Sequence, residues 1–396
     1  MSSIFILTRG EEMYTTKKNY IGIAFIHDLE LTYDARAQKE VSSLINAGYH
    51  LMICDWNKKL DGKNQEEICQ IRKLNLKANH IQVKVKKRAG FKDNIWNLIK
   101  FEIRLFKWLQ KNRSSYSCIH ACNMDTAYIG MIISRMYHKK LVYDIYDDFA
   151  DCHKCGRKLY DFIKVIDSKI IKLSDAVIIC SERRKEQLAA IPDKLYVIHN
   201  TPDIEDIDSS LMSVNRNEKM KIAYIGNLTK GRMLEEVIDI VSRHQQWELY
   251  CGGSGDLEAE IEQKAKQNDN IYFLGRLPYE KVLALEANCD VIPALYDPEF
   301  PNHIYAAPNK FYESLYLGKP TIMAHNTGMD WFVDKYHTGI TVDFNINSVE
   351  NAFALISEEL EKWREAKEEI KKLYIDNFDW KLMRKKLISM YEDLMK

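Results

Sequence analysis

Short apolar runs alternate with amphipathic segments along almost the whole chain, and this alternation limits the fold more than any other feature. The apolar runs have the length and composition of buried strands, and the segments between them have helical periodicity. Such alternation predicts parallel strands joined by right-handed helical crossovers, with helices on both faces of the sheet. The predicted strands are Ile21–Ile26, His50–Asp55, Ile81–Val85, Cys118–Ala121, Leu141–Asp144, Ala176–Cys180, Leu195–His199, Lys221–Gly226, Glu248–Cys251, Ile271–Leu274, Val291–Ala294, Pro320–Met323 and Gly339–Val342.

These strands are too many for one sheet, and a chain of 396 residues is long enough for two ordinary domains. The polar stretch 203–218 interrupts the alternation, which begins again near Met220. We therefore expect an α/β chain with one domain over residues 1–203 and a second over 204–376. A terminal segment over 377–396 follows, in which Trp380–Leu394 are predicted to form a helix.

Bulk properties narrow the class of protein. The chain has 57 Lys and Arg against 57 Asp and Glu, so nucleic acid is not an expected partner. A run of about 20 uncharged apolar residues, which a membrane-spanning helix requires, is not present in the sequence. The cysteines are odd in number and fall mostly in apolar runs, which is typical of a protein of the reducing cytoplasm.

Ligands of open parallel sheets bind outside the carboxyl ends of the strands, so these ends are where a site is expected. Gly226 and Asn227 close one predicted strand, and Lys230 and Arg232 lie in the turn before the next helix. Two cations at the start of a helix suit a pyrophosphate, although an ordinary turn with two solvated bases fits the same residues. Gly253 lies in the glycine-rich end of the following strand, where the backbone can approach a ligand closely.

The segment 306–324 (AAPNKFYESLYLGKPTIMA) carries the strongest local signal. Pro308 suits the first turn of a helix, with Asn309 and Lys310 beside it and Glu313 about one turn later on a similar face. The Glu313 carboxylate can accept both hydroxyls of a ribose, and the Asn309–Lys310 pair can serve a sugar or phosphates. A Glu/Lys pair on a solvated helix face is the alternative.

The motifs occur in a specific order. IGNL, GGSGD, NIYFLGRLPYEKV, CDVIPALY and PNKFYESLYLGKP follow DARAQKEVSSLINAGYHLMI, YDIYDDFAD, SDAVIICSERRKEQL and VIHNTPD. This series resembles the family 4 retaining glycosyltransferases of the GT-B fold, and more narrowly the capsule and exopolysaccharide members that carry a PNK-x-x-E helix. The resemblance covers the chain from about Tyr20 to Tyr391. It implies two Rossmann-like domains and a C-terminal helix that crosses back to the N-terminal domain.

The resemblance implies roles for the C-terminal residues. Glu313 corresponds to the second glutamate of the family's Glu-x7-Glu pair, which holds the donor ribose. Tyr305 stands where the first glutamate is expected, so this chain departs from the family's pattern for the transferred sugar, and Asn309 and Lys310 are expected to take over part of that role. Lys230 and Arg232 correspond to the phosphate-binding basic pair. The turn Gly275–Arg276–Leu277 corresponds to the nucleobase site.

In the N-terminal half, His120 is placed like the family's histidine that contacts the donor sugar, and a core histidine is the alternative. Asp34 and Arg36 lie in the first strand-to-helix loop and are candidates for acceptor or donor contacts. Asp34 fits a helix N-cap equally well. Asp144 and Asp147 follow another predicted strand and are expected on the acceptor side.

The implied reaction is attack by an acceptor hydroxyl on the anomeric carbon of a nucleoside-diphosphate-sugar while the nucleoside diphosphate leaves. Lys230, Arg232 and a helix N-terminus would stabilise the growing charge. The resemblance implies no metal and no other cofactor. The acid pairs Asp206/Asp208 and Asp147/Asp148 are interpreted as linker and loop residues, and Cys118, His120 and Cys122 with Cys152 and Cys155 as a weaker zinc pattern.

A basic segment extends over residues 84–113, where ten Lys or Arg face only Asp93 and Glu102 and are interleaved with Trp96, Ile103 and Trp108. A basic helix with aromatic residues is typical of an element that binds an anionic membrane surface. Packing of one helix face on the sheet is compatible with this. We therefore expect a cytoplasmic protein peripheral to the inner face of the plasma membrane, acting on a lipid-linked glycan acceptor in surface polysaccharide synthesis.

Two other functions fit the same architecture. A nucleotide-sugar 2-epimerase would isomerise the sugar nucleotide without an acceptor, and the basic segment and the PNK helix argue against it. A non-catalytic protein that binds sugar nucleotides is the third reading, and Tyr305 is its main support.

Overall fold

Eight strands form the sheet of the N-terminal domain in the order β3-β4-β2-β1-β5-β6-β7-β8. The computed structural model describes residues 22–86, 91–152, 156–203 and 207–396, without the side chains of 91–93. All neighbouring pairs in this sheet are parallel except the antiparallel pair β3–β4. The strands are β1 (Gly22–His27), β2 (His50–Asn57), β3 (Gln65–Ile71), β4 (Leu74–Gln82), β5 (Cys118–Cys122), β6 (Lys140–Ile145), β7 (Ala176–Ile179) and β8 (Leu195–Val197).

Helices cover both faces of this sheet. One face packs on α2 (Phe91–Lys111), α3 (Met124–Tyr137) and α5 (Arg157–Leu173) through residues such as Phe101, Ala127 and Ile170. The other face packs on α1 (Ala35–Asn46) through Ala37, Val41 and Leu44. Short helical turns complete this part of the chain: η1 (Leu31–Tyr33), α4 (Phe149–Cys152) and η2 (Arg183–Gln187).

The C-terminal domain is built in the same way from six parallel strands, in the orders β11-β10-β9 and β12-β13-β14. Ala223 N donates to Val291 O at 3.0 Å, and this contact joins the two groups of strands edge to edge. The strands are β9 (Met220–Asn227), β10 (Trp247–Ser254), β11 (Ile271–Phe273), β12 (Ile292–Ala294), β13 (Thr321–Ala324) and β14 (Gly339–Val342). The fold is α/β throughout, with one open, mainly parallel sheet system in each domain, as the resemblance to GT-B proteins implies.

The helices of the C-terminal domain again lie on both faces of the sheet. Apolar residues of α6 and α11 pack on one face, and those of α8, α9, α10 and α13 on the other. The elements are η3 (Ser209–Leu211), α6 (Leu234–Arg243), α7 (Glu258–Lys266), α8 (Tyr279–Ala287), η4 (His303–Tyr305), α9 (Asn309–Leu317), α10 (Asp330–Tyr336), α11 (Ile346–Glu358), α12 (Leu360–Glu365) and α13 (Lys367–Asn377).

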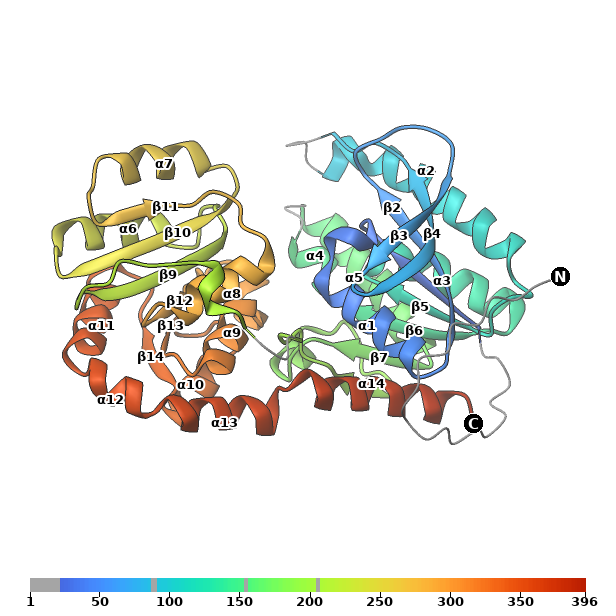
Figure 1. Cartoon of the computed structure of the whole chain (residues 1–396). Helices are drawn as coiled ribbons and strands as arrows, with labels where there is room; N and C mark the ends of the chain where they lie inside the picture. Colours follow the sequence, from blue (N-terminus) through green and yellow to red (C-terminus); the bar gives the residue numbers. More distant parts are fainter. Residues whose placement is uncertain (1–21, 87–90, 153–155, 204–206) are drawn as a thin grey trace.

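The last helix, α14 (Trp380–Leu394), leaves the C-terminal domain and lies along the N-terminal one (Figure 1). The Asp379 side chain accepts from Lys381 N and caps its N-terminus. Trp380, Met383, Leu387 and Met390 are buried at helical spacing and pack on the sheet residues Val142 and Ile178. The chain therefore crosses between the domains twice, after β8 and before α14.

One strand pair was not predicted. β3 forms a hairpin with β4 at the edge of the N-terminal sheet, and only Cys69 and Ile71 of β3 are buried. An edge strand exposed on most of its length carries polar residues, so it lacks the apolar run by which the other strands were recognised. The strand expected at Ile81–Val85 in fact runs over Leu74–Gln82. Among the described residues, no helix combines the length and apolar character needed to cross a membrane.

Candidate active site

A cleft with a volume of about 730 Å³ lies between the two domains. Residues of both domains line it, and they come mainly from the loops that follow the parallel strands, as expected for an open α/β sheet. Most of the residues predicted from the sequence meet here. Those that line the cleft are Asp34, Arg36, Asp147, Gly226, Asn227, Arg232, Gly253, Arg276, Leu277, Pro308, Asn309, Lys310 and Glu313.

On the C-terminal side, the ends of β9 and β10 approach each other very closely. Gly253 has φ of +138°, and a Cβ at this position would lie 1.7 Å from the carbonyl oxygen of Gly226. Only glycine fits there, so the two strand ends form a surface of backbone atoms in the lining of the cleft. The amide of Gly253 donates to the carbonyl of Gly275, which fixes the neighbouring turn with Arg276 and Leu277.

Two cations project over this surface. The Arg232 guanidinium lies 3.7 Å from the centre of the Tyr296 ring, and the Lys310 ammonium lies 3.5 Å from the centre of the Tyr224 ring. Burial, together with the charge of Arg232, lowers the pKa of Lys310 to about 7. The negative charge of a bound anion would oppose this shift and raise the pKa of Lys310, so this pair is suited to phosphate groups.

Lys230 is the exception among the predicted phosphate ligands. It is exposed and does not line the cleft, so the structure brings only Arg232 of the expected pair into the cleft. The left-handed conformation of Met233 (φ 52°) turns the chain after Arg232 into α6. Lys310, which was assigned to the sugar or phosphates, supplies the second cation.

Helix α9 begins directly after Pro308 and presents Glu313 to the cleft. The Glu313 side chain is buried, and the hydroxyl of Tyr279 is hydrogen-bonded to it. Burial raises the pKa of Glu313, although Tyr279 and Lys310 oppose the shift. Below it lies Glu286 of α8, which is fully buried and has no hydrogen-bond partner among the described residues. Burial, together with the charge of Glu313, raises the pKa of Glu286 far above its usual range and favours its neutral form.

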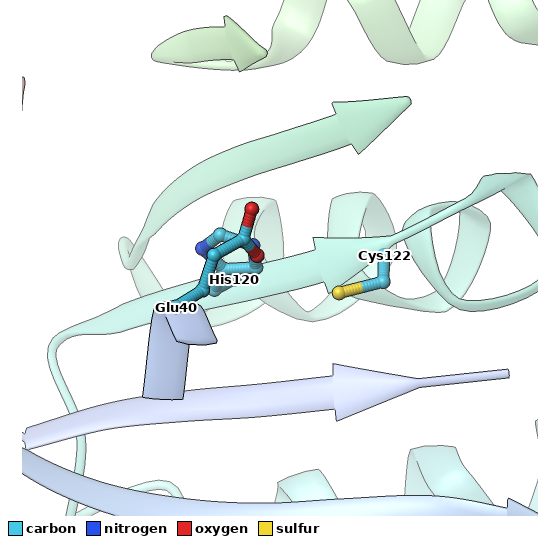
Figure 2. A group of neighbouring side chains, drawn as sticks. All are labelled: Glu40, His120 and Cys122. Carbon is cyan, nitrogen blue, oxygen red and sulfur yellow. The ribbon is translucent and has the colours of Figure 1, made fainter. Parts of the chain in front are cut away.

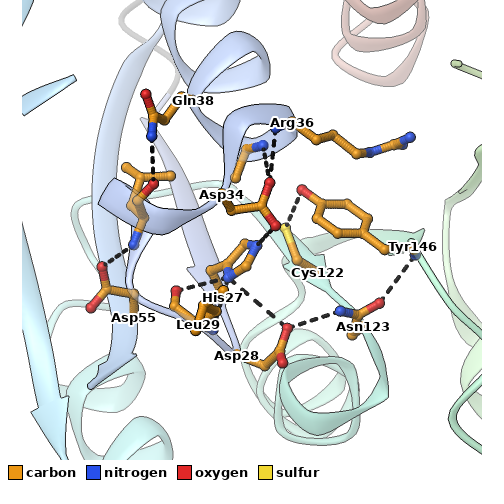
Figure 3. Close-up of polar contacts among 12 residues, drawn as sticks. His27, Asp28, Leu29, Asp34, Arg36, Gln38, Asp55, Cys122, Asn123 and Tyr146 are labelled. Atoms are coloured by element: carbon orange, nitrogen blue, oxygen red, sulfur yellow. Dashed lines mark hydrogen bonds and ion pairs between the residues drawn. The ribbon is translucent and has the colours of Figure 1, made fainter. Parts of the chain in front are cut away.

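On the N-terminal side, Asp34 caps α1 by accepting from the amides of Arg36 and Ala37, as the alternative interpretation had it, and it also lines the cleft (Figure 3). Its Oδ2 atom lies 3.4 Å from Nε2 of the buried His27. Burial alone would lower the pKa of His27, but the hydrogen bond and charge of Asp34 outweigh it and raise this pKa to about 9. The same pairing overcomes burial at Asp34 and lowers its pKa to about 2. Asp34 is therefore a fixed anion.

Arg36 reaches from the cleft into a buried network. Its Nη2 atom donates to Asp144 at 2.7 Å, its Nε lies 3.0 Å from Glu40, and Nη1 donates to the carbonyl of Ile198. Asp144 is fully buried and does not line the cleft, so its predicted place on the acceptor side is wrong. Its role in the structure is to hold Arg36. Asp147, by contrast, lines the cleft and is largely exposed.

His120 also lies in this network rather than in the cleft. Its ring is fully buried, stacks on Phe25 at 4.5 Å, and its Nδ1 lies 2.7 Å from the hydroxyl of Tyr391 in α14. Burial lowers its pKa to about 4 and keeps the ring neutral. A direct contact with a donor sugar is thus wrong for His120, and the alternative of a core histidine holds. The position of His120 in a strand did not reveal how deeply its ring is buried.

Within the described residues, one group of side chains offers metal-ligand atoms within 4.8 Å of one another: Glu40, His120 and Cys122 (Figure 2). The Arg36 guanidinium already pairs with Glu40, and the Tyr146 hydroxyl lies 3.2 Å from Glu40 and 3.4 Å from Cys122. We interpret the group as a buried hydrogen-bond network under Arg36 and Tyr146. Cys118 packs with residues of α14, in a different apolar cluster from Cys122, and Cys155 of the weaker zinc pattern lies outside the described residues.

Several cleft residues were not predicted from the sequence. Arg184, almost fully buried, donates to Asn302 Oδ1 at 3.1 Å and to Asp147 at 3.2 Å, and Asn302 Nδ2 donates to Asp147 at 3.0 Å. These contacts join the two domains across the cleft. His303 lines the cleft beside Asn302. Tyr305, the predicted donor ligand, does not line it, and its backbone carbonyl accepts from Ser181 instead. Residues 297–303 contain no motif by which their place in the cleft could have been recognised from the sequence.

Comparison with known proteins indicates the class of the C-terminal domain. Residues 209–373 match the model of the family described as glycosyl transferases group 1. The C-terminal domain is a glycosyltransferase domain. This match makes the protein an enzyme of that class and includes α9 and the Gly226–Arg232 turn. No curated protein sequence matches the chain.

Solved structures share the fold over nearly the whole chain. Sucrose-phosphate synthase from Thermosynechococcus elongatus is 15% identical with a TM-score of 0.70, and 95% of this chain and 99% of that one are covered. HepE from Anabaena in complex with UDP-glucose is 14% identical with a TM-score of 0.66, covering 94% and 100%. An E. coli trehalose-6-phosphate structure bound with UDP-2-fluoro glucose is 9% identical with a TM-score of 0.67, covering 94% and 98%. At these identities the likeness shows the fold alone.

Proposed function

We propose that the enzyme transfers a sugar from a nucleoside-diphosphate-sugar to a hydroxyl group of a glycan acceptor, with the donor held by the C-terminal domain. The observation that carries this proposal is the grouping of Arg232, Lys310 and the Glu313 carboxylate around one interdomain cleft. The two cations match a diphosphate, and Glu313 is placed to accept hydrogen bonds from the ribose hydroxyls. HepE was solved with UDP-glucose, so UDP-sugars are the first donors to test.

In the reaction, the bond between the anomeric carbon and the diphosphate oxygen breaks, and a bond to the acceptor oxygen forms. The acceptor proton passes to the departing diphosphate or to solvent, so charge and atoms balance. Arg232 and Lys310 stabilise the negative charge that grows on the leaving group, since both line the cleft and each is packed over a tyrosine ring. We propose that these side chains supply the charge stabilisation without a metal ion, and that the anomeric configuration is retained, as the resemblance to retaining enzymes implies.

Asp34 and Asp147 carry the acceptor side of the proposal. Both line the cleft from the N-terminal domain, and the carboxylate of Asp34 is kept charged by His27. Carboxylates of this kind accept hydrogen bonds from sugar hydroxyls. We propose that the acceptor is a lipid-linked glycan. We also propose that the enzyme acts in the cytoplasm, in the synthesis of a surface polysaccharide.

Helix α2 supports a membrane-bound acceptor. Its exposed stripe combines Trp96 (72% exposed) and Ile103 (50%) with Lys100, Lys107 and Lys111. Apolar and cationic side chains at this spacing suit the headgroup region of an anionic membrane. Lys87 and Arg88, which extend the basic segment, lie outside the described residues. Arg104 has another role, because it donates to the carbonyls of Gly62 and Gln82.

The membrane proposal is tested by cosedimentation with liposomes that contain anionic lipid. The variant K100E/K107E/K111E is expected to lose most of its binding, while K281E/K362E/K372E, with the same change of charge on exposed lysines of the C-terminal domain, keeps it. Equal partition of both variants and the unmodified protein contradicts the proposal.

The catalytic proposal is tested in two steps. Thermal shift with UDP-, GDP- and ADP-sugars identifies the donor, since only a bound ligand stabilises the fold. Transfer to glycan acceptors is then followed by mass spectrometry, the anomeric configuration by NMR, and the rate with and without EDTA. Isomerised sugar nucleotide in the absence of acceptor would indicate an epimerase. Unchanged donor binding in the variant E313A, measured by calorimetry, contradicts the site.

A further inference from the structure

The loop between β12 and η4 is docked on the turn that carries Arg232. The amide of Asp297 donates to the carbonyl of Gly231 at 3.0 Å, and the Phe300 ring lies 3.1 Å from the position that a Cβ on Gly231 would occupy. The loop is closed by hydrogen bonds from Phe300 N to Asp297 O and from His303 N to Phe300 O. Its position is thus fixed relative to the proposed diphosphate site.

The His303 ring is held in one orientation. Its Nδ1 atom lies 2.9 Å from the backbone carbonyl of Asp297, and the ring packs on Tyr296 and Phe300 with centroid distances of 5.1 Å to each. A carbonyl oxygen only accepts hydrogen bonds, so Nδ1 must carry the proton. In the neutral ring, Nε2 is then a hydrogen-bond acceptor, and among the described residues it has no hydrogen-bond partner. Burial and the charge of Arg232 lower the pKa of His303, which keeps the ring neutral.

The residues around His303 indicate which part of the substrate its ring contacts. Arg232, a proposed ligand of the diphosphate, lines the cleft with His303. Asn302, which precedes His303 in the chain, is hydrogen-bonded to Arg184 and Asp147 of the N-terminal domain. The ring therefore lies between the leaving group and the acceptor side, where the transferred sugar must be. Of the other candidates, Tyr305 does not line the cleft, and the acceptor atom of Asn309, Oδ1, already accepts a hydrogen bond from Asn200.

We propose that Nε2 of His303 accepts a hydrogen bond from a hydroxyl group of the transferred sugar and thereby determines which sugar the enzyme accepts. This inference rests on the proposed function and names the group that recognises the sugar in a chain with no glutamate at position 305. A neutral acceptor selects a sugar with a free hydroxyl at one ring position, and it discriminates against deoxy sugars at that position because its lone pair is then left without a partner.

The test compares two substitutions at one position. The amide of an asparagine can still donate to the Asp297 carbonyl in place of Nδ1, but H303N removes the acceptor at Nε2. H303Q places an amide oxygen near the former Nε2 and is expected to restore part of the binding. The exposed His138, the left-handed C-cap of α3, provides the control H138N, since asparagine tolerates that conformation.

Affinities are measured by calorimetry for the nucleotide-sugar and for the nucleoside diphosphate alone. For H303N we expect the nucleotide-sugar to bind about tenfold more weakly, while the diphosphate changes by less than about twofold. One monodeoxy donor should bind the unmodified enzyme about tenfold more weakly than the parent sugar, and H303N should no longer distinguish the two.

Other results overturn the inference. Equal losses for the sugar nucleotide and the diphosphate assign His303 to the phosphates. A slower turnover with unchanged donor affinity assigns it to the acceptor hydroxyl. Unchanged binding and selectivity assign it no role with the substrates. Failure of the unmodified protein to bind any nucleoside diphosphate or nucleotide-sugar overturns the proposed function itself, and a result that affects H303N alone leaves that function standing.

Discussion

The hydroxyl of Tyr312 lies 2.7 Å from Nδ1 of His199, and this hydrogen bond joins helix α9 to the N-terminal domain. Both side chains are buried, and Tyr312 immediately precedes Glu313, the proposed ribose ligand. On its other side, Nε2 of His199 lies 3.2 Å from Glu182. The position of the donor helix is thus connected to the relative placement of the two domains.

Removing the hydroxyl in Y312F should weaken donor binding without any loss of a donor contact. We expect about three- to tenfold lower donor affinity and about 1–2 kcal/mol lower stability, because Nδ1 of His199 is left without a hydrogen-bond partner. Calorimetry and urea unfolding measure the two effects. The control Y374F removes a buried hydroxyl that donates to the carbonyl of Pro202, also between the two domains. It should lower the stability but leave the donor affinity unchanged. Equal donor affinities of Y312F and the unmodified protein contradict the connection.

Lys310 lines the cleft of the proposed donor site, and Lys230 does not. K310M should lower the affinity for nucleoside diphosphate by about tenfold or more, since it removes a charge-assisted contact. K230M should leave it within about twofold. Titration calorimetry with the diphosphate decides the matter, and a larger loss in K230M would restore the assignment made from the sequence.

Both side chains of the Arg36–Asp144 pair are buried, so breaking the pair is expected to lower the free energy of unfolding strongly. D144A leaves the Arg36 charge without its closest partner and should destabilise the protein by about 3–5 kcal/mol. E66A removes a surface pair with Lys77 and should cost no more than about 1 kcal/mol. Urea unfolding of both variants gives the comparison. Similar midpoints for the two variants would show that the network does not support the fold.

The His27–Asp34 pair predicts a pH dependence of stability. The pKa of His27 is raised from 6.5 to about 9 in the folded state, so its contribution is complete below pH 6.5 and is lost as the pH rises toward 9. The pKa of Asp34 is lowered from 3.8 to about 2, so its contribution is present above pH 3.8 and is lost as the pH falls toward 2.

The variant H27Q tests this pH dependence. The difference in unfolding free energy between the unmodified protein and H27Q should be largest between pH 4 and 6.5 and should shrink by about 2 kcal/mol toward pH 9. H138N, at an exposed histidine, is the matched control and should show a difference that is constant over this range. A constant difference for H27Q as well would argue against the charged pair.

Secondary structure was predictable where a single physical signal dominates. The bounds of α14 agree with the sequence prediction, because Asp379 caps the helix and apolar residues follow at helical spacing. The buried parallel strands were recognised for the same kind of reason. The edge strand β3 was missed, because its stability depends on pairing with β4 rather than on burial of its own side chains.

The site was predictable only as far as strand ends and helix starts determine it. Gly226, Arg232 and Glu313 follow from the position of the strands and of α9, and the structure brings them together. Depth of burial was not accessible from the sequence, and for this reason His120 and Asp144 were placed in the cleft although both are buried beneath it. The position of His303 depends on a loop whose geometry is set by contacts with Gly231 and Asp147, which are distant in the sequence.

Because α14 returns to the N-terminal domain, two segments of the chain connect the two domains rather than one. A single tether would let one domain swing and twist freely, whereas two attachment points leave mainly one degree of freedom, a rotation about the line that joins them. Opening of the cleft to exchange substrates would then follow a reproducible path, and each closure would return Arg232 and Asp34 to the same separation across the bound sugar.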